Sequence, residues 1–301
     1  MSEISAADVK KLREMTGAGM MDCKSALTEA EGDFEKAIEV LRKKGQKLSV
    51  KRADRDAKEG VVIALVADDH SKGVVIRLSS ETDFVSKNED FINTAKQIAQ
   101  IALSEFPADL DALSLLPING VAIKDKVNDM VAAIGEKIGL ESYEKLEAPM
   151  VVPYIHMGNR AAVIVGLNII NDSFLEAGKD VAMQVAAMKP IAVNSEGVDK
   201  SIIEKEIEIG KEVARQEGKP EEMLEKIAEG TVQKYLKDVT LLGQVFVKAA
   251  DGKQTIEQLL KAKNASVAAF SLFVVGEGIE KKVDDFAAEV AAQAAAAAAK
   301  K

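Results

Sequence analysis

Two strand-like runs followed by an amphipathic helix occur twice in the middle of this 301-residue chain. In the first copy, residues 61–67 and 74–79 are rich in β-branched residues and flank a short polar turn. In the second copy, residues 150–157 and 161–169 form a similar pair that turns through Gly-Asn. Short turns favour antiparallel pairing. The pattern therefore predicts two related α+β units, each a β-hairpin with a helix packed against it.

The helices of the two copies align at a constant offset of 83 residues. The matched pairs are Phe91 with Phe174, Ile92 with Leu175, Lys96 with Lys179, Ile98 with Val181, and Ala99 with Ala182. At this offset the segment Thr82-Asp83-Phe84-Val85 corresponds to Val165-Gly166-Leu167-Asn168, which lacks an Asp-Phe pair. Because packing alone would leave similar residues in both copies, the difference favours a special role for Asp83 and Phe84.

The segment Thr82–Val85 follows a predicted strand and precedes a predicted helix, since Ser86 and Glu89 have the spacing of a capping box. Connections of this kind usually lie on the surface, where a ring beside a carboxylate could insert into another molecule. The alternative places Phe84 in the core and makes Asp83 a turn cap, and these four residues alone favour it, because single Phe residues are mostly buried.

Residues 1–45 predict three short helices that share one small core, because none is long enough to be stable alone. The expected start, break and end residues are Ser5, the Thr16–Gly19 segment, Asp22, Gly32, Asp33 and Gly45. A charged linker is expected over residues 46–60. The basic run from Lys43 to Arg55 overlaps this linker, is interleaved with acids, and favours a solvated helix face or linker over an RNA contact.

The remaining segments predict further helices and strands around the two units. The expected elements are a helix over about 121–138, an antiparallel helical hairpin over 199–216 and 220–236, strand material at 244–247 and 266–275, a helix near 255–260, and an Ala-rich helix from 283 that carries Phe286. The hairpin has a narrow apolar stripe, so it could pack only on itself or project as an arm that docks a partner.

Composition restricts the classes of function. Hydrophobic residues make up 47% of the chain, which is enough for real cores, and the net charge is −9. An acidic chain is a poor binder of free nucleic acid, so no stable nucleic-acid binding is expected. The single cysteine, Cys23, excludes an intramolecular disulfide and suits a reducing compartment. With no signal peptide and no long apolar run, we expect a cytoplasmic protein without a membrane contact.

The residues needed for covalent chemistry are missing. Two histidines and one cysteine cannot form a usual zinc site, and no G-x-S-x-G elbow occurs. Thr16-Gly17-Ala18-Gly19 lacks the Lys-Ser/Thr of a phosphate loop. No enzyme, metal or cofactor is therefore expected. Met20-Met21 beside this glycine turn could form an adaptable partner surface or fill the helical core, and the residues alone favour neither.

Two motifs resemble the signatures of the bacterial translation elongation factor Ts family. The first is Thr16-Gly17-Ala18-Gly19-Met20-Met21-Asp22-Cys23-Lys24-x-Ala26-Leu27, and the second is Ser80-Glu81-Thr82-Asp83-Phe84-Val85. The resemblance continues through His156-Met157-Gly158-Asn159-Arg160, Gly243-Gln244-x-Phe246-Val247 and Val275-Gly276-Glu277-Gly278-Ile279-Glu280-Lys281. These motifs cover nearly the whole chain in the expected order.

The resemblance implies an α+β fold with a ubiquitin-associated-like (UBA-like) three-helix domain and two related core subdomains with antiparallel sheets. A helical hairpin arm and a C-terminal helix complete it. The expected limits are 1–45 for the three-helix domain, 46–60 for the linker, 61–140 and 141–275 for the core subdomains, about 199–237 for the hairpin, and 276–301 for the C-terminal module.

The resemblance also implies a guanine-nucleotide exchange factor for elongation factor Tu. Thr82, Asp83, Phe84 and Val85 would act near the magnesium site of the Tu GTPase domain. The partner contacts would come from Arg13, Met20, Met21, Lys24, His156 and Phe286, although the alanine run of this tail departs from the family pattern. A homodimer or a 2:2 complex with Tu stays open, because the hairpin could mediate a dimer in some members.

An exchange factor makes and breaks no covalent bond. If nucleotide weakens its binding to the partner by some factor, it weakens nucleotide binding by the same factor. Our hypothesis is that Phe84 wedges between partner helices and Asp83 disturbs the magnesium shell, after which GTP rebinding releases the factor. The alternatives are a general protein-binding module, suggested by the three-helix segment, and an RNA-associated translation protein that uses the Lys43–Arg55 run.

Overall fold

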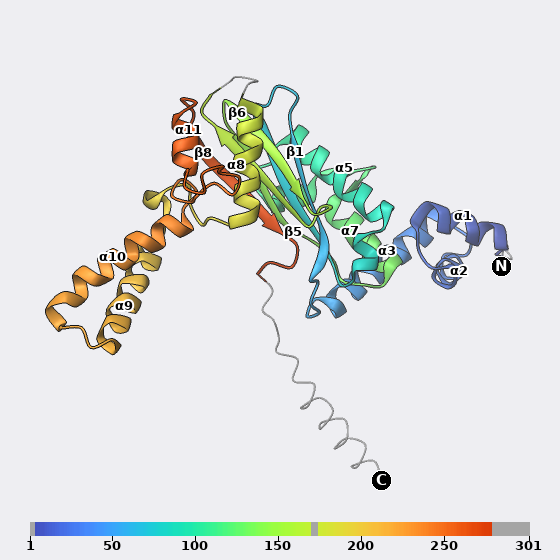
Figure 1. The fold of residues 1–301 in the computed structure, drawn as a ribbon. Coiled ribbons are helices and arrows are strands. Elements are labelled where there is room, and N and C mark those ends of the chain that lie inside the picture. The colour runs from blue at the N-terminus through green and yellow to red at the C-terminus, as the bar shows by residue number, and fades with distance from the viewer. Residues whose placement is uncertain (1–3, 170–173, 279–301) are drawn as a thin grey trace, which may run out of the picture.

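The computed structural model of the chain describes residues 4–169 and 174–278. Two three-stranded antiparallel sheets form its centre, the N-terminal helices lie at one side, and a long helical hairpin projects at the other (Figure 1). The fold is therefore α+β, as the sequence predicted.

The first sheet has the strand order β1-β2-β5. Its strands are β1 (Glu59–Val66), β2 (Lys72–Ser80) and β5 (Ile138–Glu147). The β1–β2 hairpin is the predicted one, and its register pairs Glu59 with Ser80 and Val66 with Gly73. The start of β1 and the end of β2 therefore lie at the same end of the sheet.

The second sheet repeats this topology with the order β6-β7-β8. Its strands are β6 (Met150–His156), β7 (Ala161–Leu167) and β8 (Val267–Val274). The predicted second hairpin and the predicted strand over 266–275 are both confirmed. In each sheet a hairpin is followed by a helix, and a later strand joins the second strand of the hairpin, so the repeat is a repeat of topology.

The two sheets pack against each other through small and β-branched side chains. The buried residues between them are Val62, Ala64, Val75, Val151, Ala162 and Ile164. The alternate residues of β1, Val61 and Ile63, face the helices on the other side of the first sheet. Because successive strand residues point to opposite faces, a strand between two apolar layers needs a continuous apolar run, which is what β1 has.

Helices cover the outer faces of both sheets. On the first sheet these are α5 (Glu89–Glu105) and α7 (Ile123–Ile134), with the short elements α4 (Asp83–Ser86), α6 (Leu110–Leu115), β3 (Pro117–Ile118) and β4 (Val121–Ala122) between them. On the second sheet they are α8 (Leu175–Met188) and α11 (Ile256–Lys261). The apolar spacing that predicted these helices is the spacing of their buried faces.

The helix predicted over 121–138 is too long. It ends at Ile134, because Gly135 takes the left-handed conformation with a φ of 81°, and Ile138 already begins β5. The sequence did not predict β5 because this strand is mostly half-buried and rich in polar residues. Since β5 pairs with β2 as far as Glu147, we propose that the first core unit extends to Glu147 instead of residue 140.

The N-terminal helices are α1 (Ala6–Thr16), α2 (Met20–Glu29) and α3 (Phe34–Arg52). Ser5 begins α1 with a capping box to Asp8, and Asp33 begins α3, as predicted. The shared core is also present, and its fully buried members include Leu12, Cys23 and Leu27.

Two predicted helix boundaries in this segment are wrong. Asp22 does not begin α2, which starts at Met20 after Gly19, and its carboxylate forms an ion pair with Lys44 instead. Gly45 does not end α3, which continues for seven more residues to Arg52. Gly45 is buried, and a Cβ atom there would lie 2.8 Å from the carbonyl oxygen of Asn128 in α7. The glycine thus allows close packing of two helices, and the expected linker is partly helix.

The constant offset of 83 residues holds for the helices but not for the segment before them. Residues Val165 to Leu167 lie inside β7, whereas Thr82–Val85 lie after β2. The comparison that paired these two segments is therefore wrong. The corresponding connection of the second copy runs over 168–174, and residues 170–173 lie outside the described ranges.

The projecting arm is the predicted helical hairpin, made of α9 (Lys200–Gln216) and α10 (Glu221–Val239) (Figure 1). A 3-10 turn, η2 (Ser195–Gly197), precedes it. Near its base, Val232 and Leu236 pack with Ala192 and Val198. The strand predicted at 244–247 is wrong, since only Val245 makes an isolated bridge. Buried Gln184 organises this segment instead, because its side chain binds Val245 and Val247.

The tail helix predicted from residue 283, including Phe286, lies outside the described residues. Among the helices of residues 4–169 and 174–278, we find none with the length and apolar content required to cross a bilayer.

Gly45→Ala is expected to destabilise the protein relative to Gly230→Ala. Both positions are helical, so both gain about 1 kcal/mol of helix propensity. Only Gly45 faces backbone within 3.0 Å, whereas nothing lies within 4 Å of an added Cβ at Gly230. Overpacking of this kind costs about 1–3 kcal/mol. Urea denaturation of the two variants measures the difference, and equal free energies of unfolding would contradict close packing at Gly45.

Candidate partner-binding site

The helical turn α4 holds Phe84 in solvent. Val85 and Ser86 are buried, and Val85 belongs to the core of the first sheet. The hydroxyl of Ser86 donates a hydrogen bond to the carbonyl of Asp83 at 3.1 Å. With these two residues turned inward, Phe84 points outward, and 83% of it is exposed. The alternative that placed Phe84 in the core is therefore wrong.

The helix start beside this turn differs from the predicted capping box. Asn88 begins α5, since its side-chain oxygen accepts hydrogen bonds from the N–H groups of Asp90 and Phe91 at 2.9 and 3.3 Å. Ser86 is buried and cannot serve as the cap. Ser86 and Glu89 have the sequence spacing of a capping box, but the short helical turn α4 lies between β2 and α5 and contains Ser86.

Asp83 does not cap a turn with its side chain but lies beside a lysine one helical turn further on. Its carboxylate accepts a hydrogen bond from Nζ of Lys87 at 2.6 Å. This hydrogen bond and the positive charge of Lys87 hold the pKa of Asp83 below its usual value. The surface turn therefore presents an ionised carboxylate next to an exposed ring.

Glu136, in the connection between α7 and β5, holds the first residue of the motif. Its two carboxylate oxygens accept hydrogen bonds from the backbone N–H of Thr82 at 3.1 Å and from the hydroxyl of Thr82 at 2.8 Å. Thr82 makes no capping bond of its own to α4. The position of this residue is thus fixed from outside the turn.

Glu81 joins the motif to the end of α3. Its carboxylate binds Arg52 at 3.1 Å and Arg55 at 2.9 Å, and it accepts the backbone N–H of Lys137. Burial raises the pKa of the Glu81 carboxyl, but the hydrogen bonds from Lys137, Arg55 and Arg52 outweigh this effect, so its pKa lies below the usual value. The carboxylate is ionised and its side chain is largely shielded from solvent.

The N-terminal glycine turn exposes two thioethers. Met20 is 60% exposed and Met21 is 75% exposed, so these side chains do not fill the helical core. Arg13 and Lys24 are exposed on the neighbouring turns of α1 and α2. The alternative in which both side chains fill the helical core is therefore wrong.

A cavity of about 520 Å³ brings this turn close to the start of α5. Its walls come from the end of α1 at Glu14 to Gly17, from α5 at Asn88 to Gln97, and from α7. Asn88 follows the motif after only two residues. The first signature therefore lines the same cavity as Asn88, although more than 50 residues separate the two signatures in the sequence.

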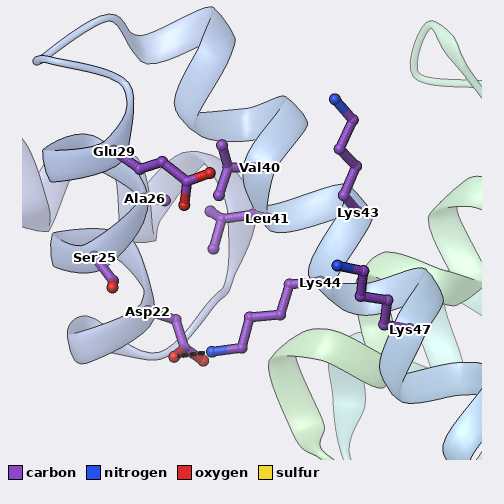
Figure 2. A pocket seen from close by; sticks show the side chains of 9 residues that line it. All are labelled: Asp22, Ser25, Ala26, Glu29, Val40, Leu41, Lys43, Lys44 and Lys47. Carbon is purple, nitrogen blue, oxygen red and sulfur yellow. Dashed lines mark hydrogen bonds and ion pairs between the residues drawn. The ribbon is translucent and has the colours of Figure 1, made fainter.

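A second cleft lies within the N-terminal helices, between α2 and α3 (Figure 2). Lys43, Lys44 and Lys47 lie along its α3 wall, and Asp22 and Glu29 lie along its α2 wall. The ion pair of Lys44 with Asp22 spans the cleft. The pair adds a polar contact to the apolar core that holds α2, which carries Met20, Met21 and Lys24, against α3.

The basic run from Lys43 to Arg55 is largely compensated by acids. The structure pairs Lys43 with Glu39, Lys44 with Asp22, and both Arg52 and Arg55 with Glu81. Phosphate binding requires cations that can exchange counterions. The pairing weakens the case for the RNA alternative.

His156 lies at the same end of the sheets as the motif. It is half-buried at the end of β6, and its Nδ1 shares a hydrogen bond of 3.1 Å with the Tyr154 hydroxyl. The following turn is tied to β1, since Arg160 pairs with Glu59 at 2.9 Å. Glu59 in turn lies opposite Ser80. The register therefore places this turn beside the motif.

We refer to this region as the motif end and define it by residues 80–86, 157–160 and 275–278. The last of these segments joins because Val275 donates a hydrogen bond to the carbonyl of Arg160 at 2.8 Å. Exposed apolar side chains at this end include Phe84 and Met157. Phe286, the remaining predicted contact, lies outside the described residues.

The sequence did not point to the residues that hold the motif. Glu81 lies inside the second signature, but nothing marked its partners Arg52, Arg55 and Lys137. Glu136 follows the glycine that ends α7, and its spacing from Thr82 carries no signal. Only the packing of α7 against α3 and the first sheet brings these groups together.

Within the described ranges, no group of three His, Cys, Asp or Glu residues could hold a metal ion.

Comparison with known proteins gives one family. The family model described as "Elongation factor TS" matches residues 81–277. The elongation factor Ts of Dechloromonas aromatica is 54% identical over 302 residues, covering 100% of both chains. That of an Azoarcus species is 53% identical over 303 residues with the same coverage. That of Christiangramia forsetii is 50% identical over 278 residues, covering 92% of this chain and 100% of the relative.

The chain belongs to the elongation factor Ts family. The predicted resemblance is thereby confirmed, and the protein is a translation elongation factor, not a catalyst of covalent chemistry. The family match begins at Glu81, the residue directly before Thr82-Asp83-Phe84-Val85, and ends within the motif end at Glu277.

Glu81→Gln is expected to reduce stability at pH 7 by about 2 kcal/mol, because a shielded carboxylate that binds two guanidinium groups is lost. The pKa of Glu81 in the folded protein lies below 4.5, its value in the unfolded chain. The contribution of Glu81 to stability is therefore fully present above pH 4.5 and is lost as the pH falls through the folded pKa. Urea denaturation between pH 7 and pH 3 measures both effects.

The matched control is Glu105→Gln, at an exposed position. We expect this variant to follow the wild-type dependence of stability on pH. Equal behaviour of the Glu81 and Glu105 variants would show that the Glu81 network does not stabilise the folded protein.

Proposed function

We propose that this protein is the guanine-nucleotide exchange factor for elongation factor Tu and that Asp83 and Phe84 insert near the magnesium site of the Tu GTPase domain. The observation that supports this most is an aromatic side chain that is 83% exposed on a turn whose neighbouring residues are buried. As a translation factor acting on Tu, the protein would act in the cytoplasm.

The exposed ring is suited to be the centre of an interface. Aromatic side chains have large apolar surfaces, and hydrophobic stabilisation follows the area removed from water. Phe84 obtains little of this stabilisation in the free protein. Because Val85, Ser86 and Thr82 already fix the turn, docking the ring costs little conformational entropy. Central aromatic anchors of this kind commonly carry much of the binding energy.

The carboxylate of Asp83 supplies a second effect. It is ionised on the same turn, and among the described residues its side-chain partner is the exposed Lys87. Magnesium neutralises the phosphates of a bound nucleotide, so displacing it or its water ligands weakens nucleotide retention. A carboxylate next to an anchoring ring is placed to compete for such a cation or for its ligands.

Linkage then sets the direction of the cycle. A factor that binds empty Tu tightly and loaded Tu weakly must weaken nucleotide binding by the same ratio. The factor accelerates release of GDP, and binding of GTP to the empty partner releases the factor. No covalent step is needed.

The contact surface would extend from the motif end to the N-terminal glycine turn. Met20 and Met21 would provide adaptable apolar contact beside the cations Arg13 and Lys24, and His156 would contribute from the β6–β7 turn. The family resemblance adds Phe286 to this proposed surface.

Phe84→Ala is expected to slow GDP release from Tu by about 30-fold, which corresponds to the roughly 2 kcal/mol lost when a central aromatic anchor is truncated. Stopped-flow release of a fluorescent GDP analogue from Tu measures the rate. Leu115→Ala is the control, because Leu115 is also a large exposed side chain, 60% accessible, and lies outside the proposed surface. Equal acceleration by Phe84→Ala and wild type would overturn the role of the ring.

Asp83→Asn is expected to slow GDP release by about tenfold in the presence of magnesium, the effect of one charge-assisted contact. This effect should vanish when EDTA removes the metal, since no cation remains to be displaced. The Phe84→Ala effect should persist in EDTA. A deficit of Asp83→Asn that is equal with and without magnesium would contradict the action on the metal shell.

A further inference from the structure

We propose that Glu136 is a positioning residue for the Asp83-Phe84 turn, in a connection of Gly135, Glu136 and Lys137 that joins this turn to the end of α3. The inference rests on the proposed function, because its consequence is measured as nucleotide exchange. Its first test, described below, does not involve Tu.

Glu136 binds the two donors of Thr82, whereas the carbonyl of Thr82 accepts hydrogen bonds from Ser80 and Ser86 beside it. Thr82 precedes α4 with an extended backbone and makes no side-chain capping bond. Both of its donors go to Glu136, the N–H at 3.1 Å and the hydroxyl at 2.8 Å. Hydrogen bonds to a charged acceptor are the stronger kind. This carboxylate therefore holds Thr82, the residue through which the chain passes from β2 into the turn that carries Phe84.

The neighbouring lysine extends the contact to α3. The backbone N–H of Lys137 donates to the carboxylate of Glu81, and its Nζ donates to the carbonyls of Ala53 and Arg55 at 2.8 Å each. Arg52, in the last turn of α3, binds the same Glu81 carboxylate. Glu136 and Lys137 thus connect the end of α3 with Glu81 and Thr82, the two residues directly before Asp83.

The backbone of Gly135 allows this connection to form. Its φ of 81° lies in the left-handed region, where a side chain would be strained. The turn directs Glu136 toward Thr82 immediately after α7, against which α3 packs closely at Gly45. Any shift of α3 relative to α7 would therefore move the carboxylates that hold the motif.

The chemistry of Thr82 distinguishes the variants. Glutamine at position 136 keeps one acceptor for the N–H of Thr82, and its amide can donate to the hydroxyl oxygen, which accepts as well as donates. Alanine removes both contacts. Thr82→Val removes the hydroxyl but keeps the shape and the backbone bond, so it tests half of the contact.

The first experiment measures the turn without Tu. The chain has no tryptophan, so Phe84→Trp introduces a single indole, whose emission is selected by exciting beyond the absorption of the tyrosines. We expect Glu136→Ala to increase the amplitude of nanosecond motion of this indole in time-resolved anisotropy, and Leu115→Ala to leave it unchanged. Unchanged anisotropy with Glu136→Ala would overturn the positioning role, whatever the function of the protein.

The second experiment measures exchange. In the chain that keeps Phe84, Glu136→Ala should lower the maximal GDP release rate at saturating factor by about tenfold, since a small misplacement of a functional group costs this much or more. Glu136→Gln should recover most of the rate, and Thr82→Val should be intermediate. Thermal melting checks the fold of each variant. If Glu136→Ala does not fold, the release rates of Glu136→Gln and Thr82→Val test the positioning role instead.

A double-mutant cycle separates positioning from direct contact. If Glu136 acts through Phe84, adding Glu136→Ala to Phe84→Ala should slow release by less than about twofold further, whereas independent contacts would add. If Phe84→Ala itself exchanges like wild type, the proposed function fails. If only Phe84→Ala is slow and Glu136→Ala is normal, this inference fails and the proposed function stands.

Discussion

The packing of the two sheets on each other is the constraint on which the other features depend. Small and β-branched residues of β1, β2, β6 and β7 form the layer between them. Since both hairpins are antiparallel and in fixed register, this layer brings the end of β2 beside the β6–β7 turn and the end of β8. The motif end is a consequence of that arrangement and not of proximity in the sequence.

At this end the protein keeps an apolar ring in water and surrounds it with rigid structure. Exposed phenylalanine gives the free protein little stability, and the neighbouring charged contacts are costly to bury. The buried Val85, the shielded Glu81 and the hydrogen bonds of Glu136 hold the turn in place before any partner binds. In a protein that acts by binding, such pre-organisation shifts free energy from folding to association.

The N-terminal helices are part of the same construction. Close packing of α3 on α7 needs a glycine at position 45, and the continuation of α3 to Arg52 delivers a guanidinium group to Glu81. The glycine turn with Met20 and Met21 lies across a cavity from the start of α5. The three-helix segment and the helices on the first sheet therefore line one cavity together.

The sequence by itself determined the class of fold, both hairpins, the main helices, the helical arm and the two signatures that identify the family. The elements follow from periodicity and turn chemistry, which act over a few residues, whereas the signatures identify the family by resemblance. Tertiary structure decided the rest. Gly45 reads as a helix end but is a contact point, and β5 is too polar to be recognised away from its partner β2. The sequence alone favours a buried Phe84, but in the structure Val85 and Ser86 are the buried residues of the turn and Phe84 is exposed. Glu136 carries no local pattern because its role depends on a residue 54 positions away, and only folding brings such groups within hydrogen-bonding distance.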